Sequence, residues 1–214
     1  MRERLPFFEN GEYIMKNIKL ILASGSPRRR ELLHQIGLDS EIIPSTVEEI
    51  ITSTEPDQVV MSLSEQKAMD VAEHSPVGSV VIGADTVVAA AGQILGKPES
   101  HEGAYEMIRH LQDDVHQVYT GVTLVLKQAD GYRQVTFAQK TDVVVYPMSD
   151  EEIRAYADSE EPMDKAGAYG IQGSFAAYIQ EIRGDYNNVV GLPVGRVYQE
   201  LKNLLEDMEE EKHD

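Results

Sequence analysis

Ile18-Lys-Leu-Ile-Leu-Ala-Ser-Gly-Ser-Pro-Arg-Arg-Arg-Glu-Leu-Leu33 decides the fold, because it predicts a short buried strand that runs through a tight turn directly into a helix. The turn is Ser24-Gly25-Ser26. Pro27 suits the first helical position, since proline has no N–H and a preset φ, and we expect Ser26 to cap the free amides of the first turn. A helix from Pro27 to Ile36 follows, with an inward stripe of leucine and isoleucine.

The first turn of this helix carries Arg28, Arg29 and Arg30. A helix N-terminus already has the positive end of the macrodipole, so cations there are unfavourable unless an anion sits among them. One interpretation is three solvated arginines on a surface helix. The other is an anion site, in which Gly25 lets a phosphate approach the backbone and guanidinium groups clamp it. No G-x-x-x-x-G-K-[ST] motif occurs, so the site is not a P-loop.

The stretch from Leu22 to Leu33 resembles the opening motif of the Maf proteins, which are nucleoside triphosphate pyrophosphatases. Later segments that resemble the family are 83–88, 96–98, 164–173 and 184–193, so the likeness covers nearly the whole chain apart from its ends. It implies a single α/β domain of the Maf/ITPase-like kind, with a long mixed β-sheet, helices on both sides and two lobes around a nucleotide-binding cleft.

The composition sets the outer limits of the interpretation. With 214 residues and 42% hydrophobic content, the chain can bury one sizeable core. No apolar run of about 18 residues is present, which argues against a membrane-bound protein. The absence of cysteine excludes thiol catalysis and thiolate metal sites and suits a cytoplasmic protein. We expect a disordered extension at residues 1–14, one domain at 15–206 and a frayed acidic tail at 207–214.

The formal net charge of -18 argues against nucleic acid as a partner. The same field repels a triphosphate at long range. Screening confines that repulsion to about 8–10 Å at physiological salt, so a local cluster of Arg and Lys with a divalent cation can dominate within a site.

Asp85 is the most informative acid in the chain. Four β-preferring residues, 79–82, run into Gly83-Ala84-Asp85, which predicts that Asp85 lies near the carboxyl end of a buried strand. Ligands bind at that edge of open α/β sheets. An acid between apolar runs needs a metal, a cation or a proton. Since cysteine and a G-x-S-x-G elbow are both absent, water is the expected nucleophile.

The resemblance to the Maf family implies a role for each candidate residue. Asp85 would accept a proton from water, and Glu49 with Asp85 would bind a divalent cation, Mg²⁺ or Mn²⁺; Glu48 stays open as the alternative to Glu49. The catalytic set is Asp85, Lys97, Arg28 and Arg29; the substrate-binding set is Ser24, Gly25, Ser26, Arg28, Lys67, Thr86 and Gln172.

Gln172 suggests which base is bound. Thymine and uracil present an acceptor, a donor and an acceptor along one edge, and a glutamine amide offers both a donor and an acceptor. The Maf branch that Tyr169-Gly-Ile-Gln-Gly173 resembles acts on dTTP and UTP, whereas a sister branch prefers methylated GTP. Arg28 and Thr86 stand at other positions associated with that choice.

The remaining pattern predicts the order of elements. Expected strands are 40–44, 118–126, 132–145 and 175–182, and expected helices are 56–74, 101–111, one opened by the Ser149–Glu152 capping box, and one from Pro193. The small residues of 164–173 indicate a close-approach loop and not core.

Two other functions stay open. The Maf family was named for inhibition of septum formation, so the chain could be a nucleotide-binding regulator that acts through a cell-division protein. It could also be a triphosphatase that releases orthophosphate. A homodimer is likewise left open.

Overall fold

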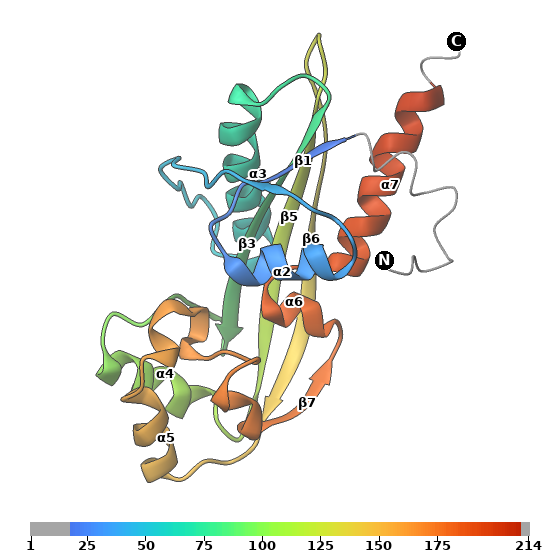
Figure 1. The fold of residues 1–214 in the computed structure, drawn as a ribbon. Helices are drawn as coiled ribbons and strands as arrows, with labels where there is room; N and C mark the ends of the chain where they lie inside the picture. The colour runs from blue at the N-terminus through green and yellow to red at the C-terminus, as the bar shows by residue number, and fades with distance from the viewer. Residues whose placement is uncertain (1–17, 211–214) are drawn as a thin grey trace.

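The computed structural model describes residues 18–210, with side chains to residue 206, and forms one mixed sheet in the order β2-β1-β3-β5-β6-β7. The expected extension at 1–14 lies outside the described residues. β1 (Lys19–Leu22) lies between β2 (Glu41–Ile42) and β3 (Ser79–Ala90), and all three run parallel. This parallel part carries the stretch that opens the chain (Figure 1).

The rest of the sheet is antiparallel. β5 (Val115–Lys127) and β6 (Tyr132–Val145) form the expected long hairpin, β4 (Gln93–Leu95) folds back on β3, and β7 (Ile179–Arg183) closes the far edge. The mixed sheet predicted from the sequence is confirmed.

The helices begin close to their sequence signals. Their bounds are α2 (Pro27–Gln35), α3 (Pro56–His74), α4 (His101–Leu111), α5 (Asp150–Ala157), α6 (Tyr186–Val190) and α7 (Val194–Glu210). Ser100 caps α4 through its hydroxyl, and Ser149 with Glu152 forms the predicted capping box of α5. Three 3₁₀ turns, η1 (Glu161–Asp164), η2 (Ala166–Ala168) and η3 (Ser174–Tyr178), connect α5 to β7.

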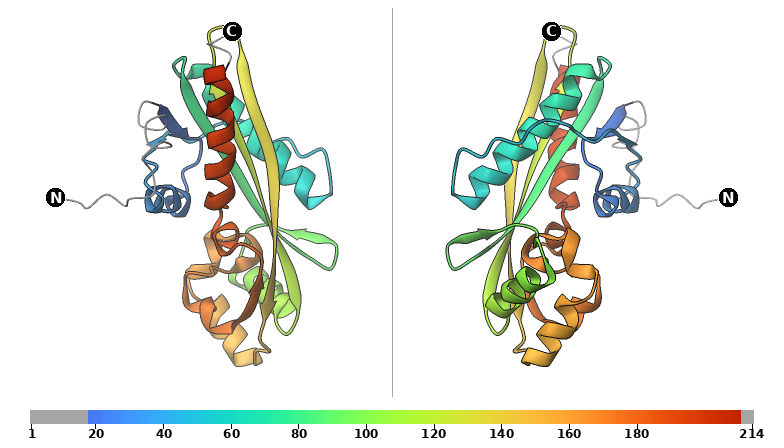
Figure 2. Two further views of the ribbon diagram at one scale, coloured as in Figure 1. Left: turned by 90° about the vertical axis from the view of Figure 1, so that its right-hand side faces the viewer. Right: turned by 90° about the vertical axis from the view of Figure 1, so that its left-hand side faces the viewer.

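Helices cover both faces of the sheet (Figure 2). Successive residues of a strand point to opposite faces. Val80 and Ile82 of β3 accordingly belong to the larger core, with α2 and α7. Val81 belongs to a second cluster with Ala68 and Val71 of α3.

The long strands run through two lobes. In Figure 1, α2, α3 and α7 flank the upper part of β3, β5 and β6, while α4 and α5 lie beside their lower part. No helix in the described part of the chain is long and apolar enough to span a bilayer.

Two expectations need correction. β3 continues to Ala90, so Asp85 lies in the middle of the strand, because antiparallel pairing with β5 extends well beyond the parallel pairing, which ends at Leu22 opposite Ile82. Residues 174–178 are a 3₁₀ turn and not strand, because Phe175 turns inward to pack on aromatic rings. The expected tail at 207–214 overlaps the end of α7, whose backbone is helical to Glu210, and its residues 211–214 lie outside the described residues.

Candidate functional site

A pocket of about 670 Å³ opens between the start of α2 and the 3₁₀ turns that follow α5. That volume lies in the range of small-molecule sites. Ten residues predicted from the sequence line it, namely Ser24, Gly25, Ser26, Arg28, Arg29, Lys67, Asp85, Thr86, Lys97 and Gln172. Glu49, the eleventh, lies outside this lining but contacts Lys67.

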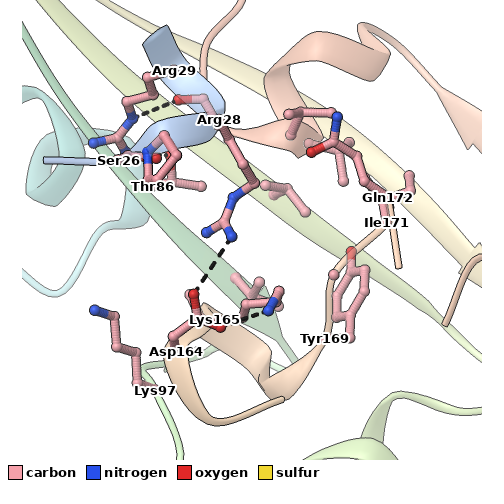
Figure 3. Close-up of a pocket in the computed structure, with 18 of the residues that line it drawn as sticks. Ser26, Arg28, Arg29, Thr86, Lys97, Asp164, Lys165, Tyr169, Ile171 and Gln172 are labelled. Carbon is pink, nitrogen blue, oxygen red and sulfur yellow. Dashed lines mark hydrogen bonds and ion pairs between the residues drawn. The ribbon is translucent and has the colours of Figure 1, made fainter. Parts of the chain in front are cut away.

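The pocket has two walls of different construction (Figure 3). We call the first the strand-end wall; it comprises Ser24–Arg29 with Lys67, Asp85 and Thr86. The second, the turn wall, comprises residues 161–173. Five cations and three carboxylates line the pocket in a chain whose net charge is -18. Positive charge is therefore concentrated here against the overall field.

The first turn of α2 opens onto the pocket without a side-chain cap. Ser26 occupies the N-cap position, but its hydroxyl accepts no hydrogen bond from the helix, so the predicted cap is wrong. Its own backbone N–H instead donates to Ser24 Oγ at 3.3 Å. Uncapped amides at a helix start attract anions, so this difference favours the anion site over the solvated surface helix.

Arg29 braces the strand-end wall. Its Nε donates to the Gly191 carbonyl at 2.9 Å, and one terminal nitrogen donates to Ser24 Oγ at 3.0 Å and to the Ala84 carbonyl at 2.9 Å. The other terminal nitrogen donates to Thr86 Oγ1 at 3.0 Å. Burial lowers the pKa of Arg29 from its ordinary value. Four of the five guanidinium N–H groups are thus held by the protein itself.

Arg28 differs from its neighbour because it reaches across the pocket. Its guanidinium approaches the Asp164 carboxylate at 3.6 Å, from the opposite wall (Figure 3). Asp164 also pairs with Lys165. Partial burial alone would raise the pKa of Asp164, but these cations lower it overall. Arg28 therefore keeps most of its donors available to a ligand.

Two glycines bring Lys67 to Asp85. An added Cβ would lie 2.2 Å from the Ser64 carbonyl oxygen at Gly83, and 2.1 Å from the Val60 carbonyl oxygen at Gly121. The helix α3 therefore lies directly on the backbone of β3 and β5. This close approach lets the Lys67 Nζ reach Asp85 Oδ1 at 2.6 Å.

Lys67 also contacts Glu49. The distance from its Nζ to Glu49 Oε1 is 2.9 Å, whereas Glu48 makes no such contact among the described residues. In that part of the chain, no group of three or more His, Asp or Glu side chains is arranged to hold a metal ion. Two carboxylates that share one ammonium partner are nevertheless a sufficient protein contribution for Mg²⁺, which commonly takes one or two carboxylates together with phosphate oxygens and water.

The turn wall contains pocket residues to which the sequence patterns assigned no role. Glu161, Asp164 and Lys165 all line the pocket. The expectation that 164–173 is not core is partly wrong, because Ala168, Tyr169 and Ile171 are buried. The glycines of this segment were a usable signal: Gly170 leaves room for the Lys165 stem and Gly173 for the Glu161 carboxylate.

Two side chains face the pocket and have no partner among the described residues. Lys97, in the loop after β4, and Gln172, in the turn wall, are exposed, and within residues 18–206 neither pairs with another side chain. Figure 3 shows both projecting toward the space between the walls. Their polar groups are therefore free to bind a ligand.

Comparison with known proteins agrees with these features. A family model described as Maf-like protein matches residues 19–204. The dTTP/UTP pyrophosphatase of Agathobacter rectalis is 53% identical over 199 residues, which cover 87% of this chain and 97% of the relative. The dTTP/UTP pyrophosphatase of Carboxydothermus hydrogenoformans is 51% identical over 185 residues, with 86% and 98% covered.

Among solved structures, a HAM1 protein from Coxiella burnetii matches with a TM-score of 0.49 and 13% identity, over 89% of this chain and 99% of that one. The family model spans nearly all the described residues, and the relatives share about half of their residues with this chain. The chain belongs to the Maf family.

Proposed function

We propose that the protein hydrolyses dTTP and UTP. The products are the nucleoside monophosphate and inorganic diphosphate (pyrophosphate). The observation that carries this proposal is one pocket that combines Arg28, Lys67 and Lys97 with the carboxylate of Asp85. A site for anion binding alone has no use for that carboxylate, which would repel phosphate. The names of the relatives from Agathobacter rectalis and Carboxydothermus hydrogenoformans support the same activity.

The reaction needs only water as nucleophile. Asp85 would accept the proton while the water oxygen forms a bond to the α phosphorus and the bond from that phosphorus to the bridging oxygen breaks, so that diphosphate leaves. Arg28, Lys67 and Lys97 would stabilise the negative charge that develops on the leaving diphosphate. The positive charge of Arg29 would add to this stabilisation. A well-placed group of this kind contributes about 3–4 kcal/mol.

We assign the divalent cation, Mg²⁺ or Mn²⁺, to Asp85 and Glu49. Both carboxylates contact the Lys67 Nζ, at 2.6 and 2.9 Å, so their oxygens can converge on one cation. A bound divalent cation would neutralise phosphate charge and polarise the phosphorus–oxygen bonds. Glu48, the alternative ligand, has no comparable contact in the described chain, which favours Glu49.

Base choice is assigned to Gln172. Its exposed amide can donate to and accept from the edge of thymine or uracil, which a carboxylate could not do. Thr86 is less suited to direct contact than expected, because its hydroxyl accepts from Arg29 at 3.0 Å and lies 2.9 Å from the Thr120 hydroxyl. It would act by holding Arg29 in place.

The regulatory alternative is not favoured, because the similar relatives carry the name of an enzyme and the pocket holds a candidate base. A panel of nucleoside triphosphates with Mg²⁺ or Mn²⁺, with both products identified, tests the proposal. We expect dTTP and UTP to give the nucleoside monophosphate and inorganic diphosphate. Release of orthophosphate would indicate a triphosphatase, a preference for 7-methyl-GTP would contradict the base assignment, and nucleotide binding without products would restore the regulator.

A further inference from the structure

The Gln172 amide is presented by a tight turn. Gly170, Ile171, Gln172 and Gly173 form a four-residue turn closed by a hydrogen bond from the Gly173 N–H to the Gly170 carbonyl at 3.0 Å. Ile171 is buried, whereas Gln172 is exposed at the pocket. The position of the amide therefore depends on what fixes the two ends of this turn.

Glu161 fixes the far end of the turn. Its Oε2 accepts hydrogen bonds from the Ser174 N–H at 3.0 Å and from the Ser174 hydroxyl at 2.7 Å. An alanine Cβ at Gly173 would lie 2.0 Å from Glu161 Oε1, so the carboxylate packs directly against the backbone beside Gln172. Hydrogen bonds to a carboxylate are stronger than those between neutral groups.

Tyr156 links the same carboxylate to the near end. Its hydroxyl donates to Glu161 Oε1 at 3.1 Å and accepts a longer hydrogen bond from the Gly170 N–H at 3.4 Å. Partial burial alone would raise the pKa of Glu161, but the hydrogen bonds from Ser174 and Tyr156 lower it overall. The carboxylate thus receives three donors and connects both ends of one turn.

We propose that Glu161 is a positioning residue for base selection, which acts by fixing the turn that presents Gln172. The inference rests on the proposed function. Glu161 does not need to touch the base, because its contacts are with the residues on either side of the turn. A carboxylate suits this place because it only accepts, whereas an amide would direct its own donors at the groups that donate to it.

The ratio of kcat/KM for dTTP to kcat/KM for CTP tests the proposal. Cytosine presents a donor where thymine presents an acceptor, so a Gln172 amide that the turn holds in one orientation should discriminate between them. Both values come from one preparation, so a change in the folded fraction cancels in the ratio. In Glu161→Gln we expect the ratio to fall about tenfold, a change worth about 1.4 kcal/mol. KM for dTTP should rise while kcat stays within about threefold.

Glu160→Gln is the matched control. It removes the same charge one residue away, and the Glu160 side chain is exposed without a contact to the turn in the described structure. We expect its ratio to equal that of the wild type. An equal fall in both variants would assign the effect to charge alone and overturn the proposal.

If Glu161→Gln fails to fold, two milder substitutions test the same proposal. Ser174→Ala removes one donor to the carboxylate, and Tyr156→Phe removes the link to Gly170; each should lower the ratio about threefold. Folded Glu161→Gln, or both smaller variants, with the wild-type ratio would refute the role of Glu161 and leave the proposed function intact. A wild type that hydrolyses no nucleotide would instead refute the proposed function itself.

Discussion

The two walls of the pocket are built in different ways. In the strand-end wall, residues come from the end of β1, the middle of β3, the start of α2 and the helix α3, which lies directly on the sheet. They hold one another through Arg29 and Lys67. The turn wall is a succession of 3₁₀ turns connected by the side chains of Glu161, Tyr156 and Lys165.

The two walls suit two different requirements of a nucleotide site. Reacting groups must be held within a fraction of an ångström, which favours regular elements and shared hydrogen bonds. A base is recognised by one amide on a short turn, so its wall can be altered without moving the reacting groups. We therefore expect substitutions in the strand-end wall to affect rate and stability, and those in the turn wall to affect selectivity.

The largest expected effect concerns Asp85. In Asp85→Asn the amide cannot accept the proton of the attacking water, and we expect kcat for dTTP to fall about 10³-fold, within the usual range for loss of a general base. Rates would be measured at saturating dTTP and Mg²⁺, with circular dichroism to check the fold.

Asp164→Asn provides the control from the turn wall. It also removes a pocket carboxylate, but one that pairs with Arg28 and Lys165 and lies away from the Lys67 contact. We expect its kcat to stay within about tenfold of the wild type. If Asp85→Asn kept more than a tenth of the wild-type kcat, Asp85 would not be the base.

A second prediction concerns the neighbouring arginines. Arg29→Lys leaves the Ala84 and Gly191 carbonyls and the Thr86 hydroxyl short of donors, so we expect the free energy of unfolding to fall by about 2–3 kcal/mol. Arg28→Lys keeps one charge beside Asp164 in a partly exposed ion pair, so its stability should change by less than about 0.5 kcal/mol. Urea unfolding measures both.

A third prediction concerns KM for dTTP, which Arg28→Lys should change although it leaves stability nearly unaltered. A lysine cannot bind phosphate through two parallel hydrogen bonds, so Arg28→Lys should raise KM for dTTP several-fold although the protein remains stable. If the two variants lost equal stability, the assignment of a structural role to Arg29 and a phosphate-binding role to Arg28 would be wrong.

The strand-end wall could largely be predicted from the sequence, because its signals are local. Pro27, the small residues before it and the run into Asp85 identify a strand, a turn and a helix start without knowledge of the fold. The sequence pattern could not predict which groups each arginine side chain binds. Arg29 and Arg28 are adjacent and chemically identical, and only the folded chain turns one to the Ala84 and Gly191 carbonyls and the other to the ligand space.

From the sequence, the turn wall was predicted only as a close-approach loop over 164–173. Its glycines indicated close approach, but the partner that approaches Gly173 is Glu161, twelve positions earlier, and no periodicity links them. The strand predicted at 175–182 begins only at Ile179, for a similar reason. Phe175 is fully buried against Tyr156, Tyr169 and Tyr178, and this non-local packing overrides the local β preference.

The last prediction concerns a contact between β5 and the turn wall. His116 of β5 lies 2.8 Å from the Tyr169 hydroxyl through its Nε2, and its Nδ1 is buried without a hydrogen-bond partner among the described residues. Burial lowers the pKa of His116 from 6.5 to about 4, and the nearby charge of Asp114 only partly opposes this. The imidazole is therefore neutral in the folded protein at neutral pH.

The unfolded chain binds a proton on His116 more readily than the folded protein does. The stabilising effect is therefore complete above about pH 6.5 and is lost as the pH falls toward 4. Between pH 8 and pH 5 we expect His116 to account for a loss of about 2 kcal/mol in the free energy of unfolding. Urea unfolding of the wild type and His116→Gln at both pH values isolates this contribution, since the variant lacks the titrating ring. If both proteins lost the same free energy, the stability of this contact would not depend on a neutral His116.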